Sequence, residues 1–342
     1  MTRALFWCIR TLAWALLALL ALLVVASAAW CVGALVIAVP GSQAMRHALA
    51  VAVVAVALAS LLVMPWRRWR WRALGAYLAL FVLVLGWYLQ LEPSNDRDWV
   101  TENARLAHAT IDGNIVTVHN VRNFTYRSEN DFTPAYYDKK LDLSRLEGVD
   151  VVASYWMGPA VAHIFLSFAF AGGDHLAVSI ETRKEKGEGY STVNGFFRQY
   201  ELYYVVADER DVIGLRTNHR QDPPEQVYVF RLQGAGDGAR RVFLDYMESL
   251  NALKAKPDFY NSLTTNCTTT IWMHGLVNPG HVPFNWKILA SGYVPEYLYE
   301  QGRLHTGGLP FAELQRRSMV NERARQAGSA ADFASRIRLN PP

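Results

Sequence analysis

The chain has 342 residues, of which 51% are hydrophobic and 19% are charged, and its formal net charge is +4. This composition excludes a disordered or collagen-like chain, and three cysteines are too few for a small disulfide-stapled domain. The positive charge does not indicate a nucleic-acid partner, because residues 1–91 hold seven arginines and no Asp, Glu or Lys, whereas the remainder holds 27 basic and 30 acidic residues.

Three apolar runs open the chain. Residues 11–45, 48–66 and 73–91 contain no charged side chain, and a helix needs only about 20 residues to cross the hydrocarbon core. We therefore predict a membrane anchor in residues 1–93, with transmembrane helices at about 11–39, 47–65 and 73–91. The alternative is a signal peptide cleaved after Ala26-Ser27-Ala28, which the longer apolar run and the two further runs disfavour.

Arginines at the ends of these runs predict the orientation. Arg3 and Arg10 precede the first run and four arginines lie in residues 67–72, whereas the connection between the first two runs holds only Arg46. Because arginine-rich ends stay on the cytoplasmic side, we expect a protein of the bacterial inner membrane with a cytoplasmic N-terminus. Residues 94–342 then form a periplasmic domain.

This exported region groups strands together with flanking helices. We predict strands within 110–126 and at 151–156, 160–170, 176–183, 203–206 and 226–232, a helical turn at 142–149, and helices at 240–253 and 267–275. The acidic stretch 208–211 is interpreted as a solvated turn, and the residues from Arg323 onward as a polar helix and tail. The pattern predicts an α+β domain with a polar C-terminal tail.

Cys267 is the only cysteine of the exported region. An oxidising compartment normally holds paired cysteines or none, so this thiol is either a buried passenger or a reactive group. Asn266, a candidate supporting residue, is a good helix N-cap, and Gly275 is a fair helix stop. Cys267 would then lie in the first helical turn, where the dipole favours a thiolate. His274 and His281 lack further ligands at zinc spacing, so we expect neither a metal nor another cofactor.

His163 is the candidate partner of this thiol, because a polar ring in an apolar strand needs a hydrogen-bond partner. The alternative is a satisfied core histidine. If residues 171–173 close a hairpin, His163 faces Glu181, which could fix its tautomer. Glu181 could instead pair with Arg183, a candidate supporting residue on the same face, or lie at a solvated edge. His175, the rival third member, falls near Ala169, about 20 Å along the strand.

Five short stretches resemble the Lnb-type N-terminal periplasmic domain family. They lie between about residues 98 and 290 and are Arg122-Asn123-Phe124-Thr125-Tyr126-Arg127, Ala162-His163-Ile164-Phe165-Leu166-Ser167-Phe168, Ser179-Ile180-Glu181-Thr182-Arg183, Tyr200-Glu201-Leu202 and Thr265-Asn266-Cys267-Thr268. The family is similar to permuted papain-like (NlpC-type) enzymes and to lecithin:retinol acyltransferase relatives, in which the histidine strand precedes the cysteine helix. Such a fold is therefore implied for the periplasmic domain. Those relatives often use a second histidine about twelve residues after the first, which His175 matches, so Glu181 and His175 both stay open.

The resemblance implies a membrane-bound Cys-His acyltransferase. It would move an acyl chain from a phospholipid, through a Cys267 thioester, to the amino-terminal diacylglyceryl-cysteine of a lipoprotein. Two other classes stay open. A periplasmic thiol peptidase or amidase acting on peptidoglycan or exported peptides would use the same residues with water as acceptor, and a non-enzymatic anchored binding module would tolerate an inert Cys267.

Overall fold

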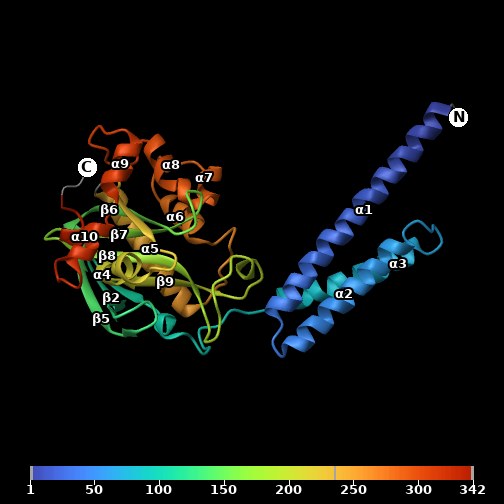
Figure 1. Ribbon diagram of the computed structural model, residues 1–342, viewed down its shortest axis with the longest axis horizontal. Coiled ribbons are helices and arrows are strands. Elements are labelled where there is room, and N and C mark those ends of the chain that lie inside the picture. The colour runs from blue at the N-terminus through green and yellow to red at the C-terminus, as the bar shows by residue number, and fades with distance from the viewer. Residues whose placement is uncertain (1–2, 235, 340–342) are drawn as a thin grey trace. The chain divides into compact units, whose positions relative to one another are not determined.

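Figure 1 shows a computed structural model of the chain, which describes residues 3–234 and 236–339. By its internal contacts the chain divides into two compact units. The first comprises Met1–Glu92 and Val193–Gln199, and the second comprises Pro93–Thr192 and Tyr200–Pro342. The loop Val193–Gln199, which contains the turn η3 (Asn194–Phe196), therefore belongs with the N-terminal helices by its contacts.

The first unit contains three apolar helices, α1 (Arg3–Ala38), α2 (Gln43–Val63) and α3 (Arg70–Leu89). Each is long and apolar enough to cross a membrane, with candidate spans at Trp7–Ala38, Gln43–Val63 and Arg70–Leu89. The three expected N-terminal membrane helices are thus confirmed as helices. Ser27 and Tyr77 form a hydrogen bond of 2.7 Å between α1 and α3.

The second unit is an α+β domain, which confirms the predicted fold class. Its strands are β1 (His108–Asp112), β2 (Ile115–Arg122), β3 (Thr125–Tyr126), β4 (Phe132–Thr133), β5 (Tyr136–Asp142), β6 (Leu146–Tyr155), β7 (Ala162–Phe170), β8 (Asp174–Arg183), β9 (Glu201–Ala207) and β10 (Gln226–Arg231). Its helices are α4 (Glu209–Gly214), α5 (Asp237–Ala255), α6 (Cys267–Gly275), α7 (Trp286–Leu289), α8 (Val294–Glu300), α9 (Phe311–Ser318), α10 (Asn321–Ala327) and α11 (Phe333–Arg336). Short turns are the 3-10 helices η1 (Thr101–Asn103), η2 (Leu143–Arg145) and η5 (Ser291–Tyr293), and the π-helical turn η4 (Leu215–His219).

One large sheet organises this domain, in the order β1-β2-β9-β8-β7-β6-β10, with β5 also paired to β2. The β7–β8 hairpin has the predicted register, in which Ala169 pairs with His175. Its turn holds Gly172 and Gly173 at φ values of 90° and 80°, a left-handed conformation that glycine adopts without strain. The helical turn predicted at 142–149 is shorter, because β6 pairs with β7 from Leu146 onward.

Alternating side chains of the sheet pack on its two faces. The α5 face packs Phe168 and Leu176 against α5, α6, α8 and α9. The α4 face packs Phe165 against α4, α10 and α11, and it also buries Phe333 and Ile337. The segment expected to be a polar helix and tail therefore supplies part of the core through Ile337, and residues 340–342 of that segment lie outside the described residues.

The acidic stretch 208–211 is not a solvated turn. It leads into α4, and the side chains of Glu209 and Asp211 are buried. Asp211 forms an ion pair with buried Arg122, with 2.7 Å between Oδ1 and Nη2. An opposite charge from a distant strand makes burial of this carboxylate tolerable, and no local sequence pattern indicates such a partner.

Candidate active site

Cys267 is the first residue of α6, as the sequence predicted. The side-chain oxygen of Asn266 accepts hydrogen bonds from the amides of Thr268 and Thr269 at 3.0 and 2.9 Å, and the Thr269 hydroxyl accepts one from the Asn266 amide. This capping box occupies the second and third amides of the helix. Asn266 thus supports the site as a helix cap. Among the described amides of the first turn, the amide of Cys267 stays available to donate a hydrogen bond to a bound group.

His163 and Glu181 meet as the hairpin register predicts. Nε2 of His163 lies 3.0 Å from Oε1 of Glu181 and 2.6 Å from Oγ of Ser179. Ser179 donates its hydroxyl hydrogen to Glu181 at 2.7 Å, so it accepts the hydrogen of His163 Nε2. Nε2 therefore carries a proton, and Nδ1 is the ring nitrogen left for the thiol.

The strands β7 and β8 separate beside this histidine. Their ladder reaches the pair Leu166–Val178, although both strands continue beyond it. In the separated part, the Ile164 amide and the His163 ring lie beside the sulfur of Cys267, where both lower the pKa of the thiol. Cys267 comes from α6 on the α5 face of the sheet, whereas His163 belongs to the opposite face of β7. The separation of the two strands allows their side chains to meet.

The electrostatics of the three groups are coupled. Burial would raise the pKa of the Cys267 thiol, but the hydrogen bond and charge of His163 outweigh burial and lower this pKa. Burial would lower the pKa of His163, but the charge of Glu181 and the hydrogen bond with Cys267 raise it to about 9. Burial would likewise raise the pKa of Glu181, which His163 and Arg216 hold well below its usual range. Each shift favours the charged form.

Arg216, which no sequence pattern indicated, holds the carboxylate of Glu181. It lies in the π-helical turn η4 and is only 4% exposed. Its Nη2 is 3.0 Å from Oε1 of Glu181, and its Nε is 3.7 Å from Oε2 of Glu225. Glu225 in turn accepts a hydrogen bond from Ser154, which pairs with His163 across β6 and β7. Glu181, the candidate third member, is therefore held in place by Arg216, which in turn contacts Glu225.

Hydrogen bonds also connect the cysteine helix with the histidine strand. The hydroxyl of Thr268 donates to the carbonyl oxygen of Ile288 in α7 at 2.6 Å. Shortly after α7, the hydroxyl of Ser291 accepts a hydrogen bond of 3.0 Å from the amide of Ala162. Thr268 and Ala162 are the direct neighbours of Cys267 and His163, so this path fixes the spacing of the two reactive side chains.

Gly292 completes this connection because it packs directly on the β6–β7 loop. Its amide donates to the carbonyl oxygen of Ala160 at 3.1 Å, and its own carbonyl accepts from the Tyr155 hydroxyl at 2.7 Å. A Cβ atom at this position would lie 2.0 Å from the carbonyl oxygen of Pro159. A residue without a side chain is therefore required for the loop to reach this position.

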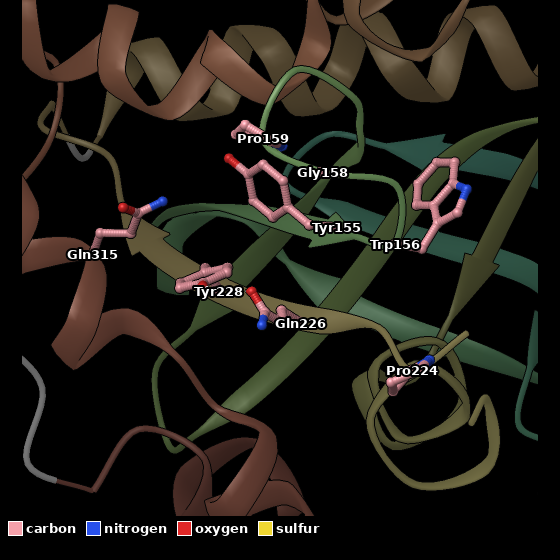
Figure 2. A pocket seen from close by; sticks show the side chains of 8 residues that line it. All are labelled: Tyr155, Trp156, Gly158, Pro159, Pro224, Gln226, Tyr228 and Gln315. Carbon is pink, nitrogen blue, oxygen red and sulfur yellow. Dashed lines mark hydrogen bonds between the residues drawn. The ribbon is translucent and has the colours of Figure 1, made fainter. Parts of the chain in front are cut away.

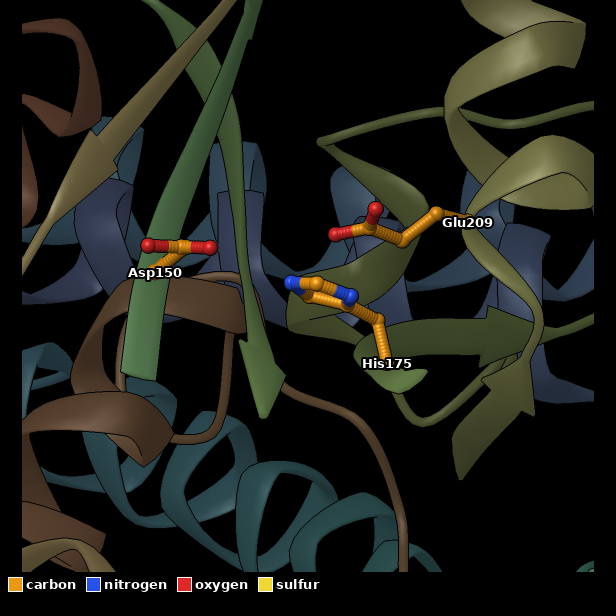
Figure 3. Close-up of side chains that lie close together, drawn as sticks. All are labelled: Asp150, His175 and Glu209. Atoms are coloured by element: carbon orange, nitrogen blue, oxygen red, sulfur yellow. The ribbon is translucent and has the colours of Figure 1, made fainter. Parts of the chain in front are cut away.

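The structure does not bring His175 to Cys267. His175 pairs with Ala169, six residues before Glu181 in β8. Figure 3 shows its ring between the carboxylates of Asp150 and Glu209 instead. The geometry thus favours Glu181 over His175 as the third member.

Arg183 does not support Glu181 either. Its guanidinium donates to the backbone oxygens of Asn103 and Ala104 at 3.0 and 3.2 Å. Glu181 pairs with Arg216 instead of Arg183, and Arg216 lies 35 residues from Glu181 in the chain.

A cavity of about 350 Å³ lies at the end of β6 (Figure 2), lined by Tyr155, Trp156, Gly158, Pro159, Pro224, Gln226, Tyr228 and Gln315. Tyr155 pairs with Ala162, which is the strand position next to the Ser154–His163 pair. The aromatic rings and side-chain amides offer stacking surface and hydrogen bonds, so this cavity is a candidate subsite beside the histidine strand.

Residues 132–292 match the family model of the Lnb N-terminal periplasmic domain. The matched segment contains His163, Glu181 and Cys267, and this finding confirms the resemblance, although the stretch Arg122–Arg127 lies outside it. A search of curated proteins and a search of solved structures gave no significant match. The candidate site therefore lies in a segment that is similar to the Lnb N-terminal periplasmic domain.

Proposed function

We propose that this chain, whose residues 132–292 are similar to the Lnb N-terminal periplasmic domain, is a membrane-bound Cys-His acyltransferase. It N-acylates the amino-terminal diacylglyceryl-cysteine of lipoproteins and takes the acyl chain from a phospholipid. The observation that carries the proposal is the contact of Cys267 with His163, whose other ring nitrogen faces Glu181 at 3.0 Å. A thiol with a lowered pKa beside an oriented imidazole is a competent nucleophile.

In the first step the Cys267 thiolate attacks the ester carbonyl carbon of the phospholipid. The Cys267 amide, at the start of α6, donates a hydrogen bond to the developing oxyanion. The tetrahedral intermediate collapses and its carbon–oxygen bond breaks, and the protonated His163 gives its proton to the leaving lysophospholipid alkoxide. The acyl chain is then held as a Cys267 thioester.

In the second step the α-amine of the diacylglyceryl-cysteine attacks the thioester carbonyl. His163 takes a proton from the amine, and the carbon–sulfur bond breaks to release the thiolate. Glu181, held by Arg216 and Ser179, stabilises the imidazolium that forms. The products are an amide on the lipoprotein and the regenerated Cys267–His163 pair.

A lipid substrate is supported by apolar side chains exposed near the site. Leu263, four residues before Cys267, is 50% exposed, and Trp286 in α7 is 59% exposed. Leu289 and Val161, which flank the Ser291–Ala162 hydrogen bond, are exposed as well. Large apolar side chains that stay exposed favour an apolar binding partner such as an acyl chain.

The membrane anchor supports the same assignment. Three spans keep the enzyme in the membrane that holds both lipid substrates, which raises their effective concentration without new contacts. The four arginines of residues 67–72, in the α2–α3 connection and at the start of α3, favour a cytoplasmic N-terminus and a cytoplasmic α2–α3 connection. The candidate cleavage site at Ala26-Ser27-Ala28 lies inside α1, and Ser27 bonds Tyr77 of α3, which supports retention of α1 as an anchor.

The deciding experiment is mass spectrometry of lipoprotein N-termini in a strain without other N-acyltransferases. Wild-type protein should produce N-acylated lipoproteins, and Cys267→Ala and His163→Ala should both abolish them, because members of one catalytic unit are not additive. Cys8→Ser, which changes a cysteine in α1, is the matched control and should retain N-acylation. Persistence of N-acylation in Cys267→Ala would refute the proposal.

The two alternatives give different outcomes. A peptidase or amidase would release a cleaved peptidoglycan fragment or peptide in a Cys267-dependent reaction, with no change in lipoprotein N-termini. A binding module would leave Cys267 unreactive toward iodoacetamide at pH 7, and this result would exclude both enzymatic functions.

A further inference from the structure

Three buried side chains converge on the α4 face of the sheet, away from Cys267. They are Asp150 of β6, His175 of β8 and Glu209 of α4, shown in Figure 3. One potential ligand atom from each lies within 4.8 Å of the other two, and the residues are 1%, 9% and 3% exposed, respectively. The sheet register brings them together, because Asp150 pairs with Ser167 and the hydroxyl of Ser167 donates to Glu209 at 2.6 Å.

The ring of His175 presents a lone pair to this cluster. Its Nδ1 lies 3.0 Å from the carbonyl oxygen of Gly173, which can only accept, so Nδ1 carries the hydrogen. Nε2 is then an acceptor, and it is buried without a hydrogen-bond partner among the described residues. A buried lone pair beside two carboxylates is unfavourable unless a cation satisfies it.

This tautomer is the one that metal-binding histidines use. In such sites one ring nitrogen ligates the ion while the other donates to a backbone carbonyl or a carboxylate.

A positive charge already lies between the two carboxylates. Nη2 of Arg338 is 2.7 Å from Oδ2 of Asp150 and 2.5 Å from Oε1 of Glu209. Arg231 also pairs with Asp150, with 2.5 Å between Nε and Oδ1. These arginines neutralise the two carboxylates, but Nε2 of His175 still has no hydrogen-bond partner among the described residues. The cluster therefore offers two carboxylates that attract a cation and one nitrogen ligand that the ion pairs do not use.

We propose that Asp150, His175 and Glu209 form a site for a divalent transition-metal ion, which takes the position held by the Arg338 guanidinium. One imidazole and two carboxylates suit Zn²⁺ or a similar first-row ion, whereas Ca²⁺ and Mg²⁺ prefer oxygen ligands alone. Because Arg338 follows α11, the metal and this C-terminal segment exclude each other from the cluster. The site is independent of acyl transfer.

The test is Zn²⁺ titration of the full-length, chelator-treated protein in detergent, followed by isothermal calorimetry. Wild type should bind one ion, and His175→Ala should weaken binding by more than about tenfold. Arg338→Ala should strengthen binding, because the competing cation is gone. His281→Ala, which removes an exposed histidine outside the cluster, is the control for surface binding and should match the wild type.

Iodoacetamide labelling of Cys267 in each variant separates loss of a ligand from loss of the fold, because Cys267 lies outside the cluster. Binding lost in His175→Ala with labelling retained supports the site. Binding that survives His175→Ala unchanged, or no binding by the wild type, overturns the proposal.

Discussion

Nη2 of Arg216 lies 3.0 Å from Oε1 of Glu181, although the two residues are 35 positions apart in the chain. Arg216 comes from the turn that follows α4, whereas Glu181 belongs to β8. The carboxylate is thereby held between an arginine and the imidazole of His163. Removal of one partner of a buried ion pair leaves the other uncompensated, so this contact makes a distant residue part of the candidate active site.

Arg216→Met should lower turnover on the order of tenfold, because Glu181 loses the group that orients it. Without the positive charge the pKa of Glu181 rises, so activity should fall at a higher pH on the acidic side of the profile. Arg216→Lys should restore part of the loss. The measurement is the pH dependence of acyl-enzyme formation.

Arg127→Met is the control, because Arg127 pairs with Asp131 and has no ion pair with Glu181 or Glu225 among the described residues. An acidic limb that moves equally in Arg127→Met and Arg216→Met would contradict a specific role for Arg216.

The thiol of Cys267 should react with iodoacetamide as an activated group. The wild-type labelling rate should reach half its maximum below pH 9.0, because His163 lowers the thiol pKa against the effect of burial. In His163→Ala the midpoint should move upward, since burial then acts without the compensating charge. Labelling is measured by mass spectrometry of the peptide that contains Cys267, in a Cys8→Ser background. An unchanged midpoint in His163→Ala would show that the two side chains do not interact.

Glu181→Gln and His175→Gln distinguish the two candidates for the third member. Glu181→Gln should lower turnover by about 10²–10⁴-fold, because a neutral amide no longer stabilises the imidazolium of His163. His175→Gln should leave turnover within about twofold of wild type, because the ring lies in the separate cluster with Asp150 and Glu209. Steady-state kinetics of both variants decide between them, and the reverse ranking would restore His175 to the catalytic unit.

Protein stability should depend on pH through His163. Its folded-state pKa of about 9 lies above the ordinary value of 6.5, so its contribution is full below pH 6.5 and is lost as the pH rises through 9. Glu181 has a depressed pKa, so its contribution is full above about pH 4.5 and is lost in acid. In a Cys267→Ala background, the melting temperature should therefore fall as the pH rises above 6.5.

The control for this measurement is His163→Ala, compared in a Cys267→Ala background. The background matters because the lowered pKa of Cys267 gives a contribution of opposite sign, which grows as the pH rises. Glu181 still raises the pKa of His163 there. If the melting temperature changed equally between pH 6.5 and 9 with and without the His163→Ala substitution, the stabilising ion pair would be contradicted.

Gly292→Ala should displace the β6–β7 loop, because the added Cβ would lie 2.0 Å from the carbonyl oxygen of Pro159. We expect a loss of about 1–3 kcal/mol in unfolding free energy, typical of overpacking, together with slower thiol labelling as His163 moves. Gly275→Ala, at the end of α6, has no atom within 4 Å of the added Cβ and should be tolerated. Equal stability of both variants, measured by thermal melts, would refute the close packing.

Several site features follow from short sequence patterns. The glycine turn and strand alternation predict the β7–β8 register, and this register, extended beyond the paired residues, places His163 opposite Glu181. The N-cap preference of Asn266 predicts the start of α6 at Cys267. The contact between these two pieces does not follow from either pattern, because it depends on α6 packing where β7 and β8 separate.

The sequence by itself determined the three apolar helices, the α+β class and the local positions of Cys267 and His163, because hydrophobic runs, turn residues and helix caps act over a few neighbouring residues. Only the tertiary structure decided that Arg216 holds Glu181, that Glu209 and Asp211 are buried, and that His175 lies in a separate cluster. The physical reason is that burial of a charge depends on an opposite charge brought from a distant element. The residues next to a buried charge in the sequence therefore do not indicate which distant residue neutralises it.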